Sequence, residues 1–270
     1  LFNGDSADVL KELKDNSVDL LATDPPYGIE FMGKSWDKVL PPKEIWEECY
    51  RVLKPGSFIA VMSSPRSDVL YRMIKDLEDA GFDMSFSPIL WTYHTGFPKA
   101  SDVSKMIDKR GVDLGDKYEG SKLGFQPKPA VEHIIIGMKP HGSKSYIDNV
   151  LNFEALPDNI KMTYPFIQVP KPAKKEKMLG TDKTIHPTIK PVKLMSYIIT
   201  LFTREGDWVL DPFLGSGTTG MASKLINRQF IGIEREKEYF DICEERLSVS
   251  REELVKFFKM EKDTQTKLEL

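Results

Sequence analysis

The sequence places an acidic residue, two prolines and a tyrosine directly after a run of mostly apolar residues. This tetrapeptide, Asp24-Pro25-Pro26-Tyr27, follows residues 18–22. The prolines fix φ and remove two backbone donors, so the first carbonyl oxygens of the turn can be held rigidly outward. An acceptor carboxylate, a stiff carbonyl and a flat ring suit the amino group of a planar base. The alternative is a strand that ends in a Pro-rich turn with a core tyrosine.

A second motif, far downstream, has the spacing of a nucleotide-binding turn. Gly215, Gly217 and Gly220 follow a short apolar strand and precede an expected helix at 221–226. Glycines there permit unusual dihedral angles and close approach of the backbone to a ligand. The next expected strand ends at Glu234, where a carboxylate can accept hydrogen bonds from ribose hydroxyls. The pattern predicts a nucleotide-type cofactor site, with a purely structural turn as the alternative.

Together the two motifs resemble those of the S-adenosylmethionine-dependent DNA amino-methyltransferases, the adenine-N6 and cytosine-N4 enzymes. The tetrapeptide precedes the glycine loop, which is similar to the permuted motif order of the β class of this family. The stretch from His186 to Pro191 strengthens the resemblance, because the family carries a similar stretch before its glycine loop. The resemblance extends from Asn3 to about Leu247.

The resemblance assigns roles to individual residues. Asp5 is similar to the family's acidic residue near the adenine amino group of the cofactor, although a plain turn aspartate is the alternative. Thr188 and Lys190 would reach the cofactor carboxylate, and Lys190 is equally placed to meet DNA phosphate. The catalytic residues would be Asp24, Pro25, Pro26 and Tyr27. The remaining cofactor-binding residues would be Asp211, Pro212, Phe213, Gly215, Ser216, Gly217, Thr218, Thr219 and Glu234.

The chemistry expected at the tetrapeptide is direct methyl transfer to an exocyclic amine. The amine is a poor nucleophile because its lone pair is delocalised into the base. Asp24 and the Pro25 carbonyl would accept its two hydrogens and favour a pyramidal nitrogen. The sulfonium of the cofactor is reactive already, so the protein mostly supplies alignment. Tyr27 would stack on a base that has left the duplex.

The residue at the first catalytic position bears on which base is methylated. Within the resembled family Asp is commoner there in adenine enzymes and Ser in cytosine-N4 enzymes. We therefore expect a site-specific methyltransferase for adenine N6 in double-stranded DNA, with cytosine N4 as the alternative. RNA or protein amide methylation is a more distant alternative. An NAD-dependent dehydrogenase would use the glycines and Glu234, but it gives no reason for the tetrapeptide.

Strands and helices are expected to alternate along the chain. Apolar runs predict strands at 17–23, 57–62, 86–93, 131–138, 207–210 and 229–233. Periodicity predicts helices at 44–53, 67–80 (with Ser67 as N-cap), 193–203 and 236–259. The alternation predicts an α/β fold with a doubly wound, mostly parallel, Rossmann-like methyltransferase sheet. Ligands of such sheets bind at the carboxyl ends of strands, where both motifs fall.

Two long segments rich in Lys, Gly and Pro interrupt this alternation. Between residues 161 and 193, eight lysines stand against two carboxylates, a net charge of +6. The charge predicts a phosphate-binding face, with a solvated loop as the alternative. We expect DNA contacts from Lys171, Lys174, Lys175 and Lys177. Three parts are expected: a catalytic half at 1–138 that includes an insertion at 95–130, a target-recognition insertion at 139–183, and a cofactor-binding half at 184–270.

Composition agrees with an α/β enzyme. The chain has 270 residues, 40% of them hydrophobic, and a formal net charge of −3, which argues against a general basic coat. No apolar stretch approaches the ~20 residues of a membrane helix. Two Cys and four His without ligand spacing predict neither a disulfide framework nor a metal site. We expect a cytoplasmic protein of bacterial, archaeal or phage origin that acts on double-stranded DNA, with a homodimer partner and a cognate restriction enzyme as further candidates.

Overall fold

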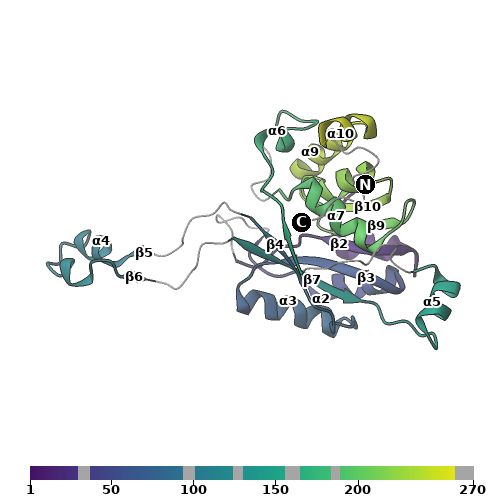
Figure 1. Ribbon diagram of the computed structural model, residues 1–270, viewed down its shortest axis with the longest axis horizontal. Helices are drawn as coiled ribbons and strands as arrows, with labels where there is room; N and C mark the ends of the chain where they lie inside the picture. The colour runs from purple at the N-terminus through teal and green to yellow at the C-terminus, as the bar shows by residue number, and fades with distance from the viewer. Residues whose placement is uncertain (30–36, 94–100, 124–129, 156–164, 184–188, 259–270) are drawn as a thin grey trace.

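A mixed sheet forms the centre of the protein in the computed structural model, which describes residues 1–29, 37–93, 101–123, 130–155, 165–183 and 189–258 (Figure 1). Neighbouring strands are parallel, except that β7 runs antiparallel to β3 and β4. The predicted doubly wound, mostly parallel sheet is confirmed. The strand order is β1 (Phe2–Asn3), β10 (Gln229–Glu234), β9 (Trp208–Asp211), β2 (Val18–Thr23), β3 (Leu53–Ser63), β7 (Val131–Met138), β4 (Ile89–Thr92) and β8 (Phe166–Gln168).

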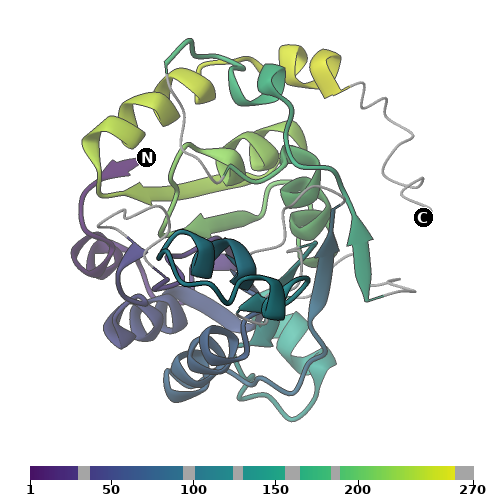
Figure 2. The same cartoon turned by 90° about the vertical axis from the view of Figure 1, so that its left-hand side faces the viewer.

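Buried apolar side chains on both faces explain why the central strands are continuous apolar runs. Leu20 of β2 packs into one core and Leu21 into the other, and Val209 and Leu210 of β9 alternate in the same way. Alternation with both faces covered requires apolar residues at successive positions. One face is covered by α1 (Ser6–Val9), α2 (Lys43–Val52) and α3 (Ser67–Asp79), and the other by α7 (Val192–Phe202), α8 (Thr218–Leu225) and α10 (Arg251–Phe258) (Figure 2).

Several predicted boundaries are corrected. The single helix expected at 236–259 is two helices, α9 (Lys237–Leu247) and α10. The Ser250 hydroxyl accepts the N–H of Glu253 at 3.2 Å, and the Glu253 carboxylate accepts the N–H of Ser250 at 2.9 Å. This capping box starts a new helix, which apolar periodicity alone does not reveal. The N-cap of α3 is Arg66, whereas Ser67 is its first helical residue.

The two predicted insertions differ in their relation to the sheet. Between β4 and β7, an arm carries the paired strands β5 (Ser101–Asp102) and β6 (Lys122–Leu123), with α4 (Val103–Asp108) and a short 3-10 turn between them. The arm stands away from the body in Figure 1. Within 139–183, α5 (Tyr146–Phe153) packs near the start of β3, β8 joins the sheet beside β4, and α6 (Lys174–Lys177) precedes a turn bonded to α9. The three-part division of the chain stays a prediction.

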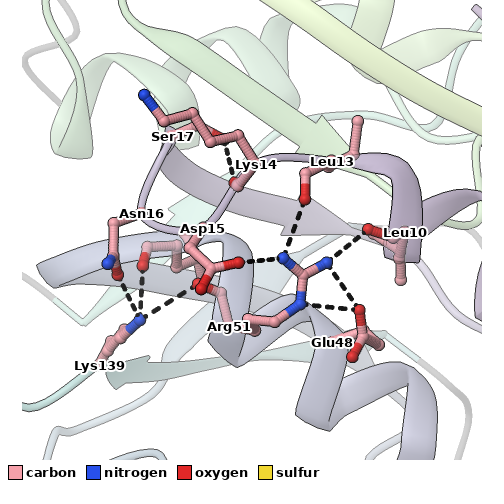
Figure 3. Close-up of polar contacts among 10 residues, drawn as sticks. Leu10, Leu13, Lys14, Asp15, Asn16, Ser17, Glu48, Arg51 and Lys139 are labelled. Carbon is pink, nitrogen blue, oxygen red and sulfur yellow. Dashed lines mark hydrogen bonds and ion pairs between the residues drawn. The ribbon is translucent and has the colours of Figure 1, made fainter.

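Polar contacts hold the amino ends of β2 and β3 together (Figure 3). The Arg51 guanidinium donates to the carbonyls of Leu10 and Leu13 at 2.7 and 2.9 Å and also bonds Glu48 and Asp15. Nearby, the Lys139 ammonium donates to Asn16 Oδ1 and to the Leu53 carbonyl, each at 2.8 Å. These contacts anchor the end of the sheet opposite to the two sequence motifs. No helix in the described ranges is long and apolar enough to cross a membrane.

Candidate active site

A cavity of about 540 Å³ opens where the carboxyl ends of β2, β9 and β10 meet, and both sequence motifs line it. Its volume lies in the range of small-molecule sites. The catalytic candidates that line it are Asp24, Pro25, Pro26 and Tyr27. The cofactor candidates that line it are Asp5, Lys190, Asp211, Pro212, Phe213, Gly215, Ser216, Thr218, Thr219 and Glu234. Gly217 is not part of the wall, and Thr188 lies outside the described residues.

Two glycines of the loop have left-handed backbone conformations, each for a different reason. Gly215 has φ +55°, and a Cβ there would meet nothing within 4 Å, which leaves its cavity side open to a ligand. Gly217 has φ +85°, and a Cβ there would lie 2.6 Å from Cys243 Sγ. The first glycine therefore permits approach from the cavity, and the second permits close packing of α8 on α9. This cradle fits the nucleotide-type cofactor that the sequence predicts.

The Glu234 carboxylate fixes the loop from the next strand. It accepts the N–H of Gly215 at 2.8 Å and the N–H of Glu236 at 2.7 Å. Burial raises the pKa of Glu234 to about 7, against the lowering effect of these backbone bonds. Each carboxylate oxygen keeps a second lone pair, so the group can still accept a ribose hydroxyl.

The turn around Asp211 is held from the neighbouring strand and helices. Asp211 Oδ1 accepts the Thr23 hydroxyl at 2.5 Å and the N–H of Phe213 at 3.0 Å. Ser6 donates to the Pro212 carbonyl at 2.5 Å, and burial raises the pKa of Asp211 to about 6. Asp5 caps α1 through the N–H of Ala7 and also lines the cavity. The residue before the tetrapeptide is thus bonded directly to the first residue of the glycine motif.

The tetrapeptide is fixed by contacts to both of its ends. Asp24 Oδ1 accepts the Tyr27 hydroxyl at 2.7 Å, and Oδ2 accepts the Lys190 ammonium at 2.6 Å. Asp37, a buried residue that sequence reasoning missed, accepts the backbone N–H groups of Tyr27 and Gly28 at 2.6 and 3.1 Å. Burial raises the pKa of Asp24 above its usual value, and Lys190 opposes this rise. The structure places the Lys190 ammonium on the Asp24 carboxylate, the first residue of the tetrapeptide.

Sequence reasoning missed three further residues at the site, which lie in β4, in β7 or directly after β4. Glu132 Oε2 lies 3.3 Å from Lys190 Nζ, and Glu132 Oε1 accepts the Tyr93 hydroxyl at 3.2 Å. Trp91 also lines the cavity. Because β7 runs antiparallel, its amino end meets the carboxyl ends of the parallel strands. The sequence signal that could have identified Glu132 is a charged residue near the start of a mostly apolar strand.

The predicted DNA-contacting lysines divide into two groups. Lys171 and Lys177 line the cavity, and the Lys171 ammonium lies 4.3 Å from the Tyr93 ring centroid. Lys174 and Lys175 are exposed on α6 and do not line it. The described part of the lysine-rich segment therefore extends from the cavity wall onto the neighbouring surface.

Comparisons with known proteins agree with this architecture. The chain is similar to the type II methyltransferase M.HpaI of Haemophilus parainfluenzae, with 33% identity over 249 residues that cover 88% of this chain and 70% of the relative. It is similar to a Thermus thermophilus protein solved in complex with S-adenosyl-L-methionine (TM-score 0.59, 25% identity, 92% of each chain covered). It shares its fold with the cytosine-N4-specific PvuII DNA methyltransferase (TM-score 0.63, 21% identity, 95% and 90% covered).

The family model described as DNA methylase, for N6 and N4 methyltransferases, matches residues 18–245. That range contains the tetrapeptide, the lysine on its carboxylate, and the glycine loop with its acidic partner. The chain belongs to this family of DNA N6/N4 amino-methyltransferases, which use S-adenosylmethionine.

Proposed function

We propose that the protein methylates the N6 amino group of adenine in double-stranded DNA. The observation that carries the proposal is one cavity that Asp24, at the end of β2, shares with the glycine loop after β9. The amine acceptor and the cofactor cradle are thereby adjacent. The aspartate at the first catalytic position favours adenine, since the family more often has serine there in cytosine-N4 enzymes. Cytosine N4 is the second candidate, and a cytosine-N4 enzyme shares the fold.

The proposed chemistry is alignment of a weak nucleophile. Asp24 accepts one amino hydrogen and the Pro25 carbonyl accepts the other, so the nitrogen lone pair turns toward the methyl donor. S-adenosylmethionine supplies an activated methyl group. As the new C–N bond forms, the bond from the methyl carbon to sulfur breaks and leaves its electrons on sulfur. The methylated amine then loses a proton to Asp24 and from there to solvent.

The proposed roles of the other residues follow their places in the cavity. The Tyr27 ring stacks on the flipped base, a contact that contributes about 1–3 kcal/mol. Glu234 holds the cofactor ribose, and Lys171, Lys174, Lys175 and Lys177 meet DNA phosphates. Target recognition falls to residues 139–183, with help from the arm. A homodimer, a cognate restriction enzyme and a cytoplasmic location remain predictions.

The cofactor assignment is tested at the loop glycine that packs on α9. In Gly217→Asp the new Cβ would collide with Cys243 at a left-handed backbone position, so the loop must shift. We expect affinity for S-adenosylmethionine, measured by calorimetry, to fall more than about tenfold, or 1.4 kcal/mol. Gly206→Asp is the matched control, because its φ is +87° and nothing lies within 4 Å. Equal affinities in the two variants would refute the assignment.

The DNA face is tested by salt dependence. Replacing Lys171, Lys174, Lys175 and Lys177 with Ala should weaken binding to every duplex sequence, because bonds to phosphate carry no sequence information. The slope of log K against log salt should fall by about 0.9 for each phosphate that is no longer neutralised. The control replaces four exposed lysines elsewhere, Lys11, Lys14, Lys43 and Lys256. An unchanged slope in the first variant would show that these lysines form only a solvated surface.

The base assignment is tested by nucleoside mass spectrometry on duplex DNA treated with the protein and isotope-labelled cofactor. We expect label in N6-methyladenine. Asp24→Ala should reduce transfer by on the order of 10²–10⁴-fold while cofactor affinity is retained, since it removes the acceptor that orients the amine. Tyr27→Ala should lose stacking, and Tyr27→Phe should be much milder. Label only in N4-methylcytosine would contradict the adenine assignment and leave the mechanism intact.

A further inference from the structure

We propose that Glu132 and Lys190 are positioning residues of the methyl transfer, which act on the target amine only through Asp24. Lys190 keeps the Asp24 carboxylate ionised and aimed into the cavity, and Glu132 holds Lys190 in place from the antiparallel strand. The inference rests on the proposed amine methylation at Asp24. It does not depend on whether the base is adenine or cytosine.

The geometry places one cation between two carboxylates. Lys190 Nζ lies 2.6 Å from Asp24 Oδ2 and 3.3 Å from Glu132 Oε2, and the Lys190 and Glu132 side chains are only 8% and 14% exposed. The Asp24 side chain is 25% exposed, so it is the more accessible of the two carboxylates. The Tyr27 hydroxyl is bonded to Asp24 and lies 3.4 Å from Glu132. Both carboxylates line the cavity and share the Lys190 cation, and Asp24 is the one more open to a substrate.

Three distant parts of the chain contribute to this group. Asp24 follows β2, Glu132 lies near the start of β7, and Lys190 precedes α7. The second oxygen of Glu132 is held by Tyr93, which follows β4. The titratable or charged groups packed around the Asp24 carboxylate and its neighbours are Lys190, Glu132, Tyr27, Tyr93, Asp211, Asp37 and Lys171.

The arrangement matters because the target amine is a hydrogen donor. A protonated Asp24 would present a donor of its own and lose part of its acceptor capacity. Burial favours the protonated form of Asp24, and so does the negative charge of Glu132, whereas Lys190 favours the ionised form. An isolated buried carboxylate is costly, so the cation is what stabilises an ionised acceptor at this depth. The two residues therefore act on Asp24 with opposite electrostatic signs.

The opposite effects of Lys190 and Glu132 on the ionisation of Asp24 can be tested by the pH dependence of the reaction. The rate at saturating DNA and labelled cofactor is measured against pH, and all methyl label in DNA is counted, whichever base carries it. Only ionised Asp24 accepts the amine, so the rate falls on the acid side as Asp24 protonates. Lys190→Met removes the charge that lowers the pKa of Asp24. The acid limb, which is the part of the profile where the rate falls with decreasing pH, should therefore move to higher pH, and the rate at neutral pH should drop. Glu132→Gln removes a charge that raises this pKa, so the limb should move to lower pH.

A merely structural role would not produce shifts of opposite sign. The control is the exposed pair Lys43–Glu47 on α2, where Lys43→Met and Glu47→Gln should leave the profile unchanged. Thermal unfolding and far-UV circular dichroism report whether each variant is folded. If Lys190→Met does not fold, Lys190→Arg, which keeps the charge and should keep the limb near its original pH, is compared with Glu132→Gln.

The outcomes separate this inference from the proposed function. If the unaltered protein labels DNA and the acid limbs of the two variants move in opposite directions, the result supports both the proposed function and the positioning role. Label with superimposable profiles, or with both limbs displaced in the same direction, overturns the positioning role alone. No label from the unaltered folded protein overturns DNA methylation and this inference with it.

Discussion

The pairing of β2 with β9 is the constraint on which the rest of the site depends. It places Thr23 against Asp211, 188 residues apart, where the threonine hydroxyl donates to the carboxylate at 2.5 Å. Since both strands are parallel, the segments that follow them emerge at the same edge. The segments that carry the proposed amine acceptor and the glycine loop are therefore joined through two buried side chains, and displacement of either strand would separate them.

A fully parallel sheet would leave this edge to loops and helix ends, whereas strand β7, antiparallel to both of its neighbours, brings its amino end to this edge. The chain enters β7 at the edge where the other strands end, so a residue near its start, Glu132, contacts the same Lys190 and Tyr27 side chains that contact Asp24. The cation before α7 then lies between two acids. The opposite edge, held by Arg51 and Lys139, provides the fixed base of the sheet. The candidate site and these anchoring contacts thus lie at opposite ends of the same strands.

The parts that the sequence predicts well are those governed by local pattern. Runs such as Leu20-Leu21 are apolar because both faces are covered, and Gly215 and Gly217 stand where left-handed backbone is required. The residues that were missed depend on pairing between distant segments: Glu132 looks like an ordinary strand residue until the direction of β7 is known. The break before α10 was local, but its capping box was hidden by continuing apolar periodicity.

The most direct test is the structure of the protein bound to S-adenosylhomocysteine and a duplex that carries its methylation site. We expect one extrahelical base whose exocyclic nitrogen lies within hydrogen-bond distance, about 2.7–3.2 Å, of both an Asp24 carboxylate oxygen and the Pro25 carbonyl. The cofactor sulfur should lie against the glycine loop, on the side of the cavity opposite those acceptors. A flipped base held elsewhere, or a cofactor away from Gly215 and Glu234, would contradict the proposed mechanism.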